Sequence, residues 1–161
     1  MNGKMQMNEC GHIVETEWLK TTEIRDNIAL DTYTVMPNHF HGIVVILNLY
    51  AHNVGANSRS PKSFTSDSPV KPPMNPKSLS SLISGFKAAV TAQINRQRNT
   101  PGIPVWQRNY YEHIIRNEKE LNRIREYIHE NSLQWDLDRE NPHSKNFNLD
   151  YTVYWSKIYE R

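Results

Sequence analysis

The feature that most constrains the fold of this chain is a long apolar stripe between residues 79 and 94. Its members recur with the 3.6-residue period of an α-helix, and they are Leu79, Leu82, Ile83, Phe86, Val90 and Ile94. The pattern predicts a helix from Ser78 to about Gln97. A helix with one apolar face is stable only when that face is buried against another layer, so the other elements have to supply that layer.

Two strand-like segments can supply it. Residues 28–36 and 39–47 are rich in residue types that favour strands. The dipeptide Pro37-Asn38 between them is typical of a turn. The sequence therefore predicts a β-hairpin.

Helical and strand-like patterns continue on both sides of the hairpin. Asn8 followed by Glu9 is typical of a helix N-cap, and it predicts a helix from Asn8 to Lys20. Residues 106–116 indicate a third strand, and residues 118–130 a helix with Leu121, Ile124 and Ile128 on one face. This order predicts an α+β fold with an antiparallel sheet and helices packed on one face of it.

The chain of 161 residues is long enough for one domain. Residues 53–78 hold five of the nine prolines and six serines, which predicts a flexible loop. We expect residues 1–135 to form the domain and residues 136–161 a polar C-terminal tail.

Composition excludes several classes of protein. The longest apolar run, residues 42–47, is far shorter than the roughly 20 residues of a membrane-spanning helix. Residues 1–10 lack the order of a signal peptide, and the single cysteine, Cys10, rules out an internal disulfide and a cysteine-rich zinc site. We therefore expect a cytoplasmic protein with no membrane partner.

Charge is distributed unevenly. The whole chain carries a net charge of +2, but residues 85–125 hold eight basic and three acidic residues. A polyanion such as nucleic acid would be drawn to this segment. A solvated helix face rich in arginine is the alternative interpretation.

His39 and His41 are candidate metal ligands. Side chains two residues apart in a strand point to the same face, so the two imidazoles should lie side by side. Neutral imidazole binds several divalent ions, although two histidines at the surface would give the same pattern. Tyr127 and Asn131 lie four residues apart at the edge of the apolar stripe of the last helix. They could face a site on the sheet, or serve as a flanking residue and a helix C-cap.

Four motifs in this order resemble the single-tyrosine transposases of the HUH class, and most closely their REP-associated branch. The motifs are Met36 to Gly42 (MPNHFHG), Leu79 to Lys87 (LSSLISGFK), Trp106 to Arg116 (WQRNYYEHIIR) and Tyr127 to Asn131 (YIHEN). The resemblance covers residues 3 to 135.

The resemblance implies a fold and a set of roles. His39 and His41 match the histidines that hold a Mg²⁺ or Mn²⁺ ion, Tyr127 matches the nucleophile, and Asn131 matches the residue that completes the ligand set. The implied fold is a ferredoxin-like antiparallel sheet. The implied activity is the nicking and rejoining of single-stranded hairpin DNA through a 5′-phosphotyrosine.

The basic segment with its interleaved aromatic residues suits a single strand of DNA. The residues that we expect to contact DNA are Lys87, Arg96, Arg108, Tyr110, Arg116 and Arg123. Tyr110 and Tyr111 could also be core residues of the third strand, and we expect one of them to be. The sequence leaves monomer and homodimer open.

The chain departs from the resembled family at its start. Family members begin with a further strand upstream of residues 3–5, and that strand lies in the middle of the ferredoxin-like sheet. We expect the described chain to lack it. The alternative function is therefore a DNA-binding remnant that recognises hairpins but no longer cleaves them, and a small metal-binding protein unrelated to DNA is a third interpretation.

Overall fold

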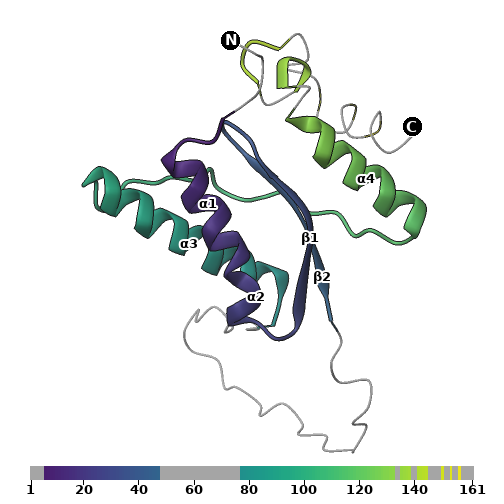
Figure 1. Cartoon of the computed structure of the whole chain (residues 1–161), viewed down its shortest axis with the longest axis horizontal. Coiled ribbons are helices and arrows are strands. Elements are labelled where there is room, and N and C mark those ends of the chain that lie inside the picture. The colour runs from purple at the N-terminus through teal and green to yellow at the C-terminus, as the bar shows by residue number, and fades with distance from the viewer. Residues whose placement is uncertain are drawn as a thin grey trace, which may run out of the picture.

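The computed structural model describes residues 6–47, 77–132, 135–138, 141–144, 150, 153 and 156. The protein is an α+β fold with a two-stranded antiparallel sheet in the described part of the chain (Figure 1). Its elements are α1 (Glu9–Leu19), α2 (Thr21–Ile24), β1 (Ile28–Val35), β2 (Phe40–Ile46), α3 (Leu79–Arg98), α4 (Glu118–Asn131) and the 3₁₀ turn η1 (Trp135–Leu137).

The three predicted helices are present, and side chains cap their first turns. Asn8 Oδ1 accepts a hydrogen bond of 2.9 Å from Gly11 N at the start of α1, as the sequence predicts. Ser78 Oγ accepts from Ser81 N, and Asn117 Oδ1 accepts from Glu120 N. Each cap satisfies a backbone donor that has no partner within its helix. The short helix α2, which the sequence pattern does not predict, continues directly from the end of α1.

The predicted hairpin is also present, and it contains a β-bulge. Val35 pairs with Phe40 next to the turn, and Ile28 pairs with Ile46 at the open end. The register shifts between Leu30 and Tyr33, so that two residues of β1 lie opposite one residue of β2. Leu30 and Tyr33 therefore both face the core, although they are three residues apart.

Helices α1 and α3 cover one face of the sheet and build the core with it. The Trp18 ring of α1 is 1% exposed and makes edge contacts with Phe40 at 4.7 Å and Phe86 at 5.3 Å between ring centroids. A Cβ atom added at Gly42 would lie 2.7 Å from Trp18 Cζ2. Glycine at this position lets the indole lie directly on β2.

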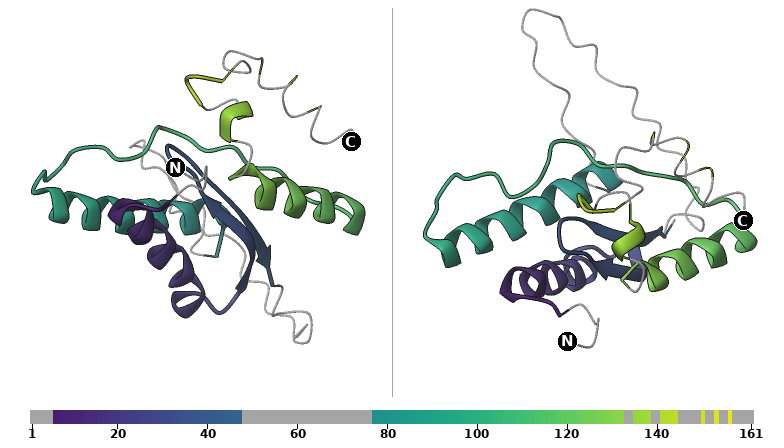
Figure 2. Two further views of the ribbon diagram at one scale, coloured as in Figure 1. Left: turned by 45° about the horizontal axis from the view of Figure 1, so that its top comes forward. Right: turned by 90° about the horizontal axis from the view of Figure 1, so that it is seen from above.

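Helix α4 packs on the opposite face, so the prediction that all helices share one face is wrong (Figure 2). Phe40 of β2 contacts α1 and α3, whereas the next residue, His41, contacts Tyr127 of α4. Neighbouring residues of a strand point to opposite faces. The apolar stripe of α4 identifies a buried side of the helix, but it does not specify which face of the sheet covers it.

The predicted strand over residues 106–116 is absent from the described structure. This segment runs in irregular conformation from the end of α3 to Asn117, and Asn109 interrupts it with a left-handed φ of 65°. Lys87 Nζ donates to the carbonyl oxygens of Gln107 and Asn109 at 3.0 and 2.9 Å. A side chain therefore takes up carbonyl groups that a strand would pair with a neighbouring strand.

Two expectations are not tested by the described residues. Positions 53–76 of the expected loop lie outside these residues, and the boundary at residue 135 between domain and tail stays a prediction. None of the helices that the structure describes is both long and apolar enough to cross a membrane.

Candidate functional site

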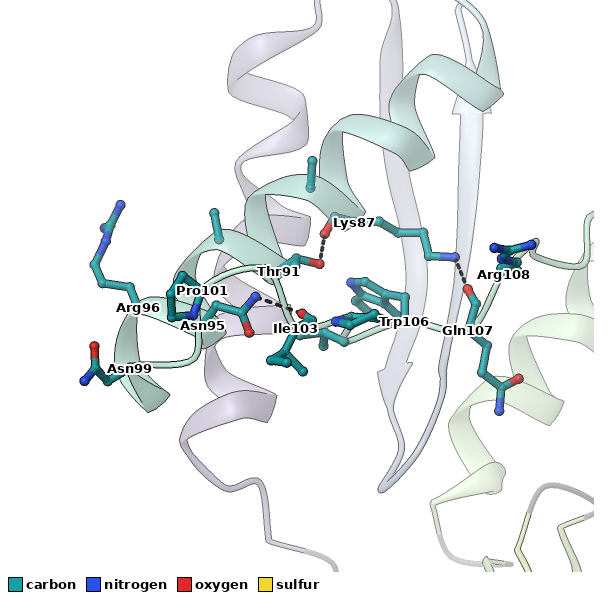
Figure 3. A pocket seen from close by; sticks show the side chains of 15 residues that line it. Lys87, Thr91, Asn95, Arg96, Asn99, Pro101, Ile103, Trp106, Gln107 and Arg108 are labelled. Carbon is teal, nitrogen blue, oxygen red and sulfur yellow. Dashed lines mark hydrogen bonds between the residues drawn. The ribbon is translucent and has the colours of Figure 1, made fainter.

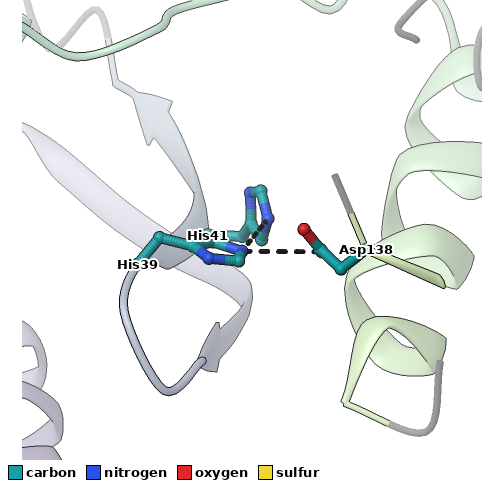
Figure 4. A group of neighbouring side chains, drawn as sticks. All are labelled: His39, His41 and Asp138. Carbon is teal, nitrogen blue, oxygen red and sulfur yellow. Dashed lines mark hydrogen bonds and ion pairs between the residues drawn. The ribbon is translucent and has the colours of Figure 1, made fainter. Parts of the chain in front are cut away.

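The two predicted histidines lie side by side where the hairpin turn enters β2. Their Nε2 atoms are 3.0 Å apart, and their ring centroids are 4.7 Å apart at an angle of 81° (Figure 4). His39 precedes the first residue of β2, and His41 is the second residue of the strand. The two-residue spacing thus brings both imidazoles to the same face.

Both rings can present a nitrogen lone pair to a metal ion. Asn38 Oδ1 lies 2.8 Å from His39 Nδ1 and can accept a hydrogen bond from it. In the neutral tautomer of His39 that donates this bond, the lone pair is on Nε2. Burial, and secondly the charge of His39, lower the pKa of His41 to about 3. His41 is therefore neutral at physiological pH.

The spacing of the two nitrogens fits one shared ion. Imidazole nitrogens bind divalent metals at about 2.0–2.1 Å, so two ligands on one ion lie roughly 3 Å apart. The observed separation of 3.0 Å matches this value, and an ion bound there would replace the hydrogen bond between the two rings. The histidine pair can therefore hold a divalent cation.

A third potential ligand, Asp138, lies beside the pair. Its Oδ2 atom is 3.7 Å from His39 Nε2, and the Asp138 side chain is 2% exposed. One ligand atom from each of the three residues lies within 4.8 Å of the others. Sequence analysis missed Asp138, because a single aspartate in a polar tail carries no periodic or motif signal.

The segment that carries Asp138 also contacts the histidine pair through Trp135. The Trp135 ring lies 6.0 Å from the His39 ring between centroids. Asp138 N donates to Trp135 O at 3.0 Å, and Asn141 Nδ2 donates to the same carbonyl at 3.0 Å. The start of the expected tail thus forms part of this site.

The side chain of Tyr127 on α4 also lies at this site. Its ring lies edge-on to the His41 ring, with centroids 5.4 Å apart and an angle of 75°. The Tyr127 side chain is half-buried. The structure therefore brings the predicted nucleophile next to a predicted metal ligand.

Asn131 lies one helical turn after Tyr127 and is 4% exposed. Its Nδ2 atom has no hydrogen-bond partner within the described part of the chain. Asn131 is the last residue of α4, and Ser132 is the C-cap. The alternative role of Asn131 as a C-cap is therefore wrong.

An ion pair holds α4 on the sheet close to Tyr127. Arg125 Nη2 donates to Asp31 Oδ2 at 2.6 Å, and Arg125 Nε donates to Asp31 Oδ1 at 3.0 Å. Asp31 lies in the bulge of β1 and also accepts from Thr32 N. The Arg125 guanidinium, assisted by Thr32, holds the pKa of the Asp31 carboxyl well below its usual range. This two-point contact fixes the position of α4 two residues before Tyr127.

Three of the predicted DNA-binding cations line one groove. The groove has a volume of about 870 Å³ and lies between α3 and residues 101–108 (Figure 3). Lys87, Arg96 and Arg108 line it, together with the Trp106 ring, and its described lining contains no acidic side chain. None of the three residues of the histidine–aspartate cluster belongs to the lining.

The remaining predicted DNA contacts lie outside this groove. Tyr110 is 41% exposed, and its hydroxyl lies 3.1 Å from Ser80 Oγ. Tyr111 is 49% exposed, so the expectation that one of the two tyrosines is a core residue is wrong. Arg116 is exposed just before α4, and Arg123 is half-buried on α4.

Comparisons with known proteins give one relative. No protein-family model matches the chain, and no solved structure matches it significantly. An uncharacterized protein of Haemophilus influenzae is 34% identical over 144 residues, which cover 86% of this chain and 73% of the relative. The chain therefore belongs to the same protein family as this Haemophilus influenzae protein.

Proposed function

We propose that the protein is a metal-dependent DNA transposase that nicks and rejoins single-stranded hairpin DNA with Tyr127 as nucleophile. The observation that carries this proposal is the contact between the Tyr127 and His41 rings. Residues 86 positions apart in the sequence meet there. They combine a nucleophile with a pair of nitrogen ligands 3.0 Å apart.

The reaction would proceed by attack of the Tyr127 phenolic oxygen on the scissile phosphorus. A new phosphorus–oxygen bond to Tyr127 forms while the bond to the 3′ oxygen of the preceding nucleotide breaks. The phenol loses its proton to solvent, and the departing oxygen takes up a proton to become a 3′-hydroxyl. The product is a 5′-phosphotyrosine, which a 3′-hydroxyl can attack in reverse to rejoin the strand.

The chain has residues for each part of this task. A phenol is protonated at pH 7 because its ordinary pKa is about 10, so its attack needs assistance. His39 and His41 would hold a Mg²⁺ or Mn²⁺ ion, with Asn131 as the further ligand that the transposase resemblance implies. Such an ion supplies stabilisation of the charge that develops on the phosphate. The contact between Arg125 and Asp31 would keep Tyr127 in line with the phosphate.

The basic groove supports a nucleic-acid substrate. Three cations and an indole ring line the same depression, and a single strand binds to such surfaces by phosphate contacts and base stacking. Arg116 and Arg123 would extend the positive surface toward α4. The strand would then lie across the chain from α3 to Tyr127.

The finer architecture of the proposed fold is a ferredoxin-like sheet with a further strand. Val45 and Ile46 of β2 are 42% and 55% exposed, which is apolar surface that another strand would cover. The irregular segment 106–116 would pair with that strand. A crystal structure of the full-length protein should then show a further strand paired with an edge of this sheet.

The two-stranded sheet of the described residues also favours a second candidate, a DNA-binding remnant without cleavage. One assay separates the two functions. The protein is incubated with Mn²⁺ and a pool of labelled single-stranded oligonucleotides that contain imperfect palindromes, and covalent adducts are resolved on a denaturing gel. An adduct that is absent in Tyr127→Phe and present in the control Tyr111→Phe supports the transposase. Hairpin binding without an adduct supports the remnant, and the absence of both contradicts both functions.

A further inference from the structure

We propose that Asp138 is a third protein ligand of a first-row divalent cation bound by His39 and His41 in the DNA-free protein. The inference rests on the proposed function for the expectation that the two histidines hold an ion. It requires neither Tyr127 nor DNA cleavage. It adds a carboxylate to the ligand set that the sequence predicts.

The distances carry the first step. His39 Nε2 lies 3.0 Å from His41 Nε2 and 3.7 Å from Asp138 Oδ2. One ligand atom from each residue lies within 4.8 Å of the others. Ligands of one first-row ion lie roughly 3–3.5 Å apart when each is about 2.1 Å from the metal. The distance from Asp138 to His39 exceeds this range by a few tenths of an ångström, and that from Asp138 to His41 is at most 4.8 Å, so the Asp138 side chain would move toward the histidines when an ion binds.

Burial carries the second step. The Asp138 side chain is 2% exposed, and that of His39 is 16% exposed. Removing a carboxylate from water is costly unless a cation or a set of hydrogen bonds compensates for its charge. A divalent ion between Asp138 and the two imidazoles would add a positive charge next to this buried carboxylate.

The backbone holds Asp138 in place without help from an ion. Asp138 N donates to Trp135 O at 3.0 Å, and Asn141 N donates to Asp138 O at 3.2 Å. The Trp135 ring lies against His39, with centroids 6.0 Å apart. The carboxylate is therefore presented to the histidines by a preformed turn, which lowers the entropy cost of binding a cation.

The donor set selects the class of cation. Mg²⁺ prefers an all-oxygen environment, whereas two imidazole nitrogens and one carboxylate oxygen suit Mn²⁺, Fe²⁺, Co²⁺ or Zn²⁺. Three protein ligands should also bind more tightly than the histidine pair alone. We therefore expect the DNA-free chain to bind Mn²⁺ in preference to Mg²⁺.

The test is a titration of the full chain with Mn²⁺, followed by electron paramagnetic resonance of the free ion. We expect one Mn²⁺ per chain, and a loss of affinity of about tenfold or more in Asp138→Asn. Asp136→Asn is the matched control, because Asp136 is an exposed aspartate of the adjacent 3₁₀ turn. Equal affinities in Asp138→Asn and the wild type, or no binding by the wild type, would overturn the proposal.

A second measurement does not depend on the fold of a variant. Crystals of the wild-type chain soaked in Mn²⁺ should give an anomalous peak within bonding distance of both imidazoles and of Asp138. A peak bonded to the histidines and remote from Asp138 would contradict the assignment. Thermal melting of the metal-free Asp138→Asn protein then shows whether its loss of affinity comes from unfolding.

Failure of this inference can be distinguished from failure of the proposed function. Tyr127→Phe should retain the Mn²⁺ affinity of the wild type. Asp138-dependent binding of Mn²⁺ without any DNA adduct would leave this inference intact and count against the transposase. A Tyr127-dependent adduct with Mn²⁺ affinity unchanged in Asp138→Asn would do the reverse.

Discussion

The Tyr127 ring on α4 lies edge-on to the His41 ring on β2, with ring centroids 5.4 Å apart. The two residues are 86 positions apart in the chain and belong to separate sequence motifs. Their contact depends on α4 occupying the sheet face that α1 and α3 leave uncovered. The candidate site therefore follows directly from the placement of this helix.

Replacing His41 by alanine should abolish most of the proposed covalent chemistry. The variant loses one of the two nitrogen ligands, and we expect the yield of DNA adduct to fall by about 100-fold or more. Binding of hairpin DNA should be nearly unchanged. His129→Ala is the control, because His129 is an exposed histidine of α4, and it should keep full adduct formation. An undiminished adduct in His41→Ala would contradict the assigned site.

Replacing Asp31 by asparagine should loosen α4. Arg125 loses its charged partner, so we expect the free energy of unfolding to fall by about 1–2 kcal/mol, reduced by the partial exposure of Arg125. Glu118→Gln is a matched control, since the exposed Glu118 pairs with the same arginine at 3.5 Å, and it should change stability by less than about 0.5 kcal/mol. Urea denaturation measures both. Equal effects of the two changes would show that the Asp31 pair does not hold the helix.

The same pair predicts a dependence of stability on pH. Arg125 lowers the pKa of Asp31 in the folded protein, whereas the unfolded chain has an ordinary aspartate pKa of about 3.9. The unfolded state therefore takes up the proton first as the pH falls. The stability difference between the wild type and Asp31→Asn should be constant above about pH 5 and should shrink below about pH 4. A difference that grows with acid would contradict this assignment.

Substitution of two glycines by alanine should have opposite effects. At Gly42 the new methyl group would clash with Trp18 and Phe40, so we expect a loss of about 1–3 kcal/mol. At Gly85, inside α3, the nearest atom is Arg25 Nη2 at 3.9 Å, and alanine should stabilise the helix by about 0.5–1 kcal/mol. Thermal or urea unfolding of both variants tests the packing of Trp18 on β2. A gain of stability in Gly42→Ala would contradict it.

Neutralising groove cations should weaken DNA binding in a salt-dependent way. The slope of log K against log salt is negative, and each lost phosphate contact with a single strand reduces its magnitude by about 0.7. We expect Arg96→Gln and Arg108→Gln each to show this decrease in fluorescence anisotropy titrations. Arg98→Gln is the control, because Arg98 lies on the same helix, outside the groove lining, and contacts Cys10 Sγ. A salt slope equal to that of the wild type in both groove variants would remove the groove from the DNA surface.

Local patterns predict the elements whose stability is local. The apolar period of residues 79–94 and the Pro37-Asn38 turn are enough to predict α3 and the hairpin, and Asn8 alone predicts the start of α1. The histidine pair follows from strand geometry in the same way. Each of these predictions needs only neighbours within a few residues.

Predictions that depend on distant partners fail. Residues 106–116 have strand-like composition, but a strand forms only when another strand accepts its hydrogen bonds, and here Lys87 takes two of the carbonyl groups. The face chosen by α4 depends on Arg125 meeting Asp31, 94 residues away. Asp138 lies beside the histidines because of the course that the chain takes after α4. The spacing of residues in the sequence does not predict this course.

The bulge lets β1 carry one residue more than β2 without moving the core side chains on either side of it. Deleting one of Asp31 and Thr32 would make the ladder regular, because Leu30 and Tyr33 would then lie two residues apart and would still face the core. The pairing of the hairpin therefore does not require the extra residue. That residue belongs to the segment that presents the Asp31 carboxylate to Arg125, so homologous chains that lose it should also lose this anchor of α4.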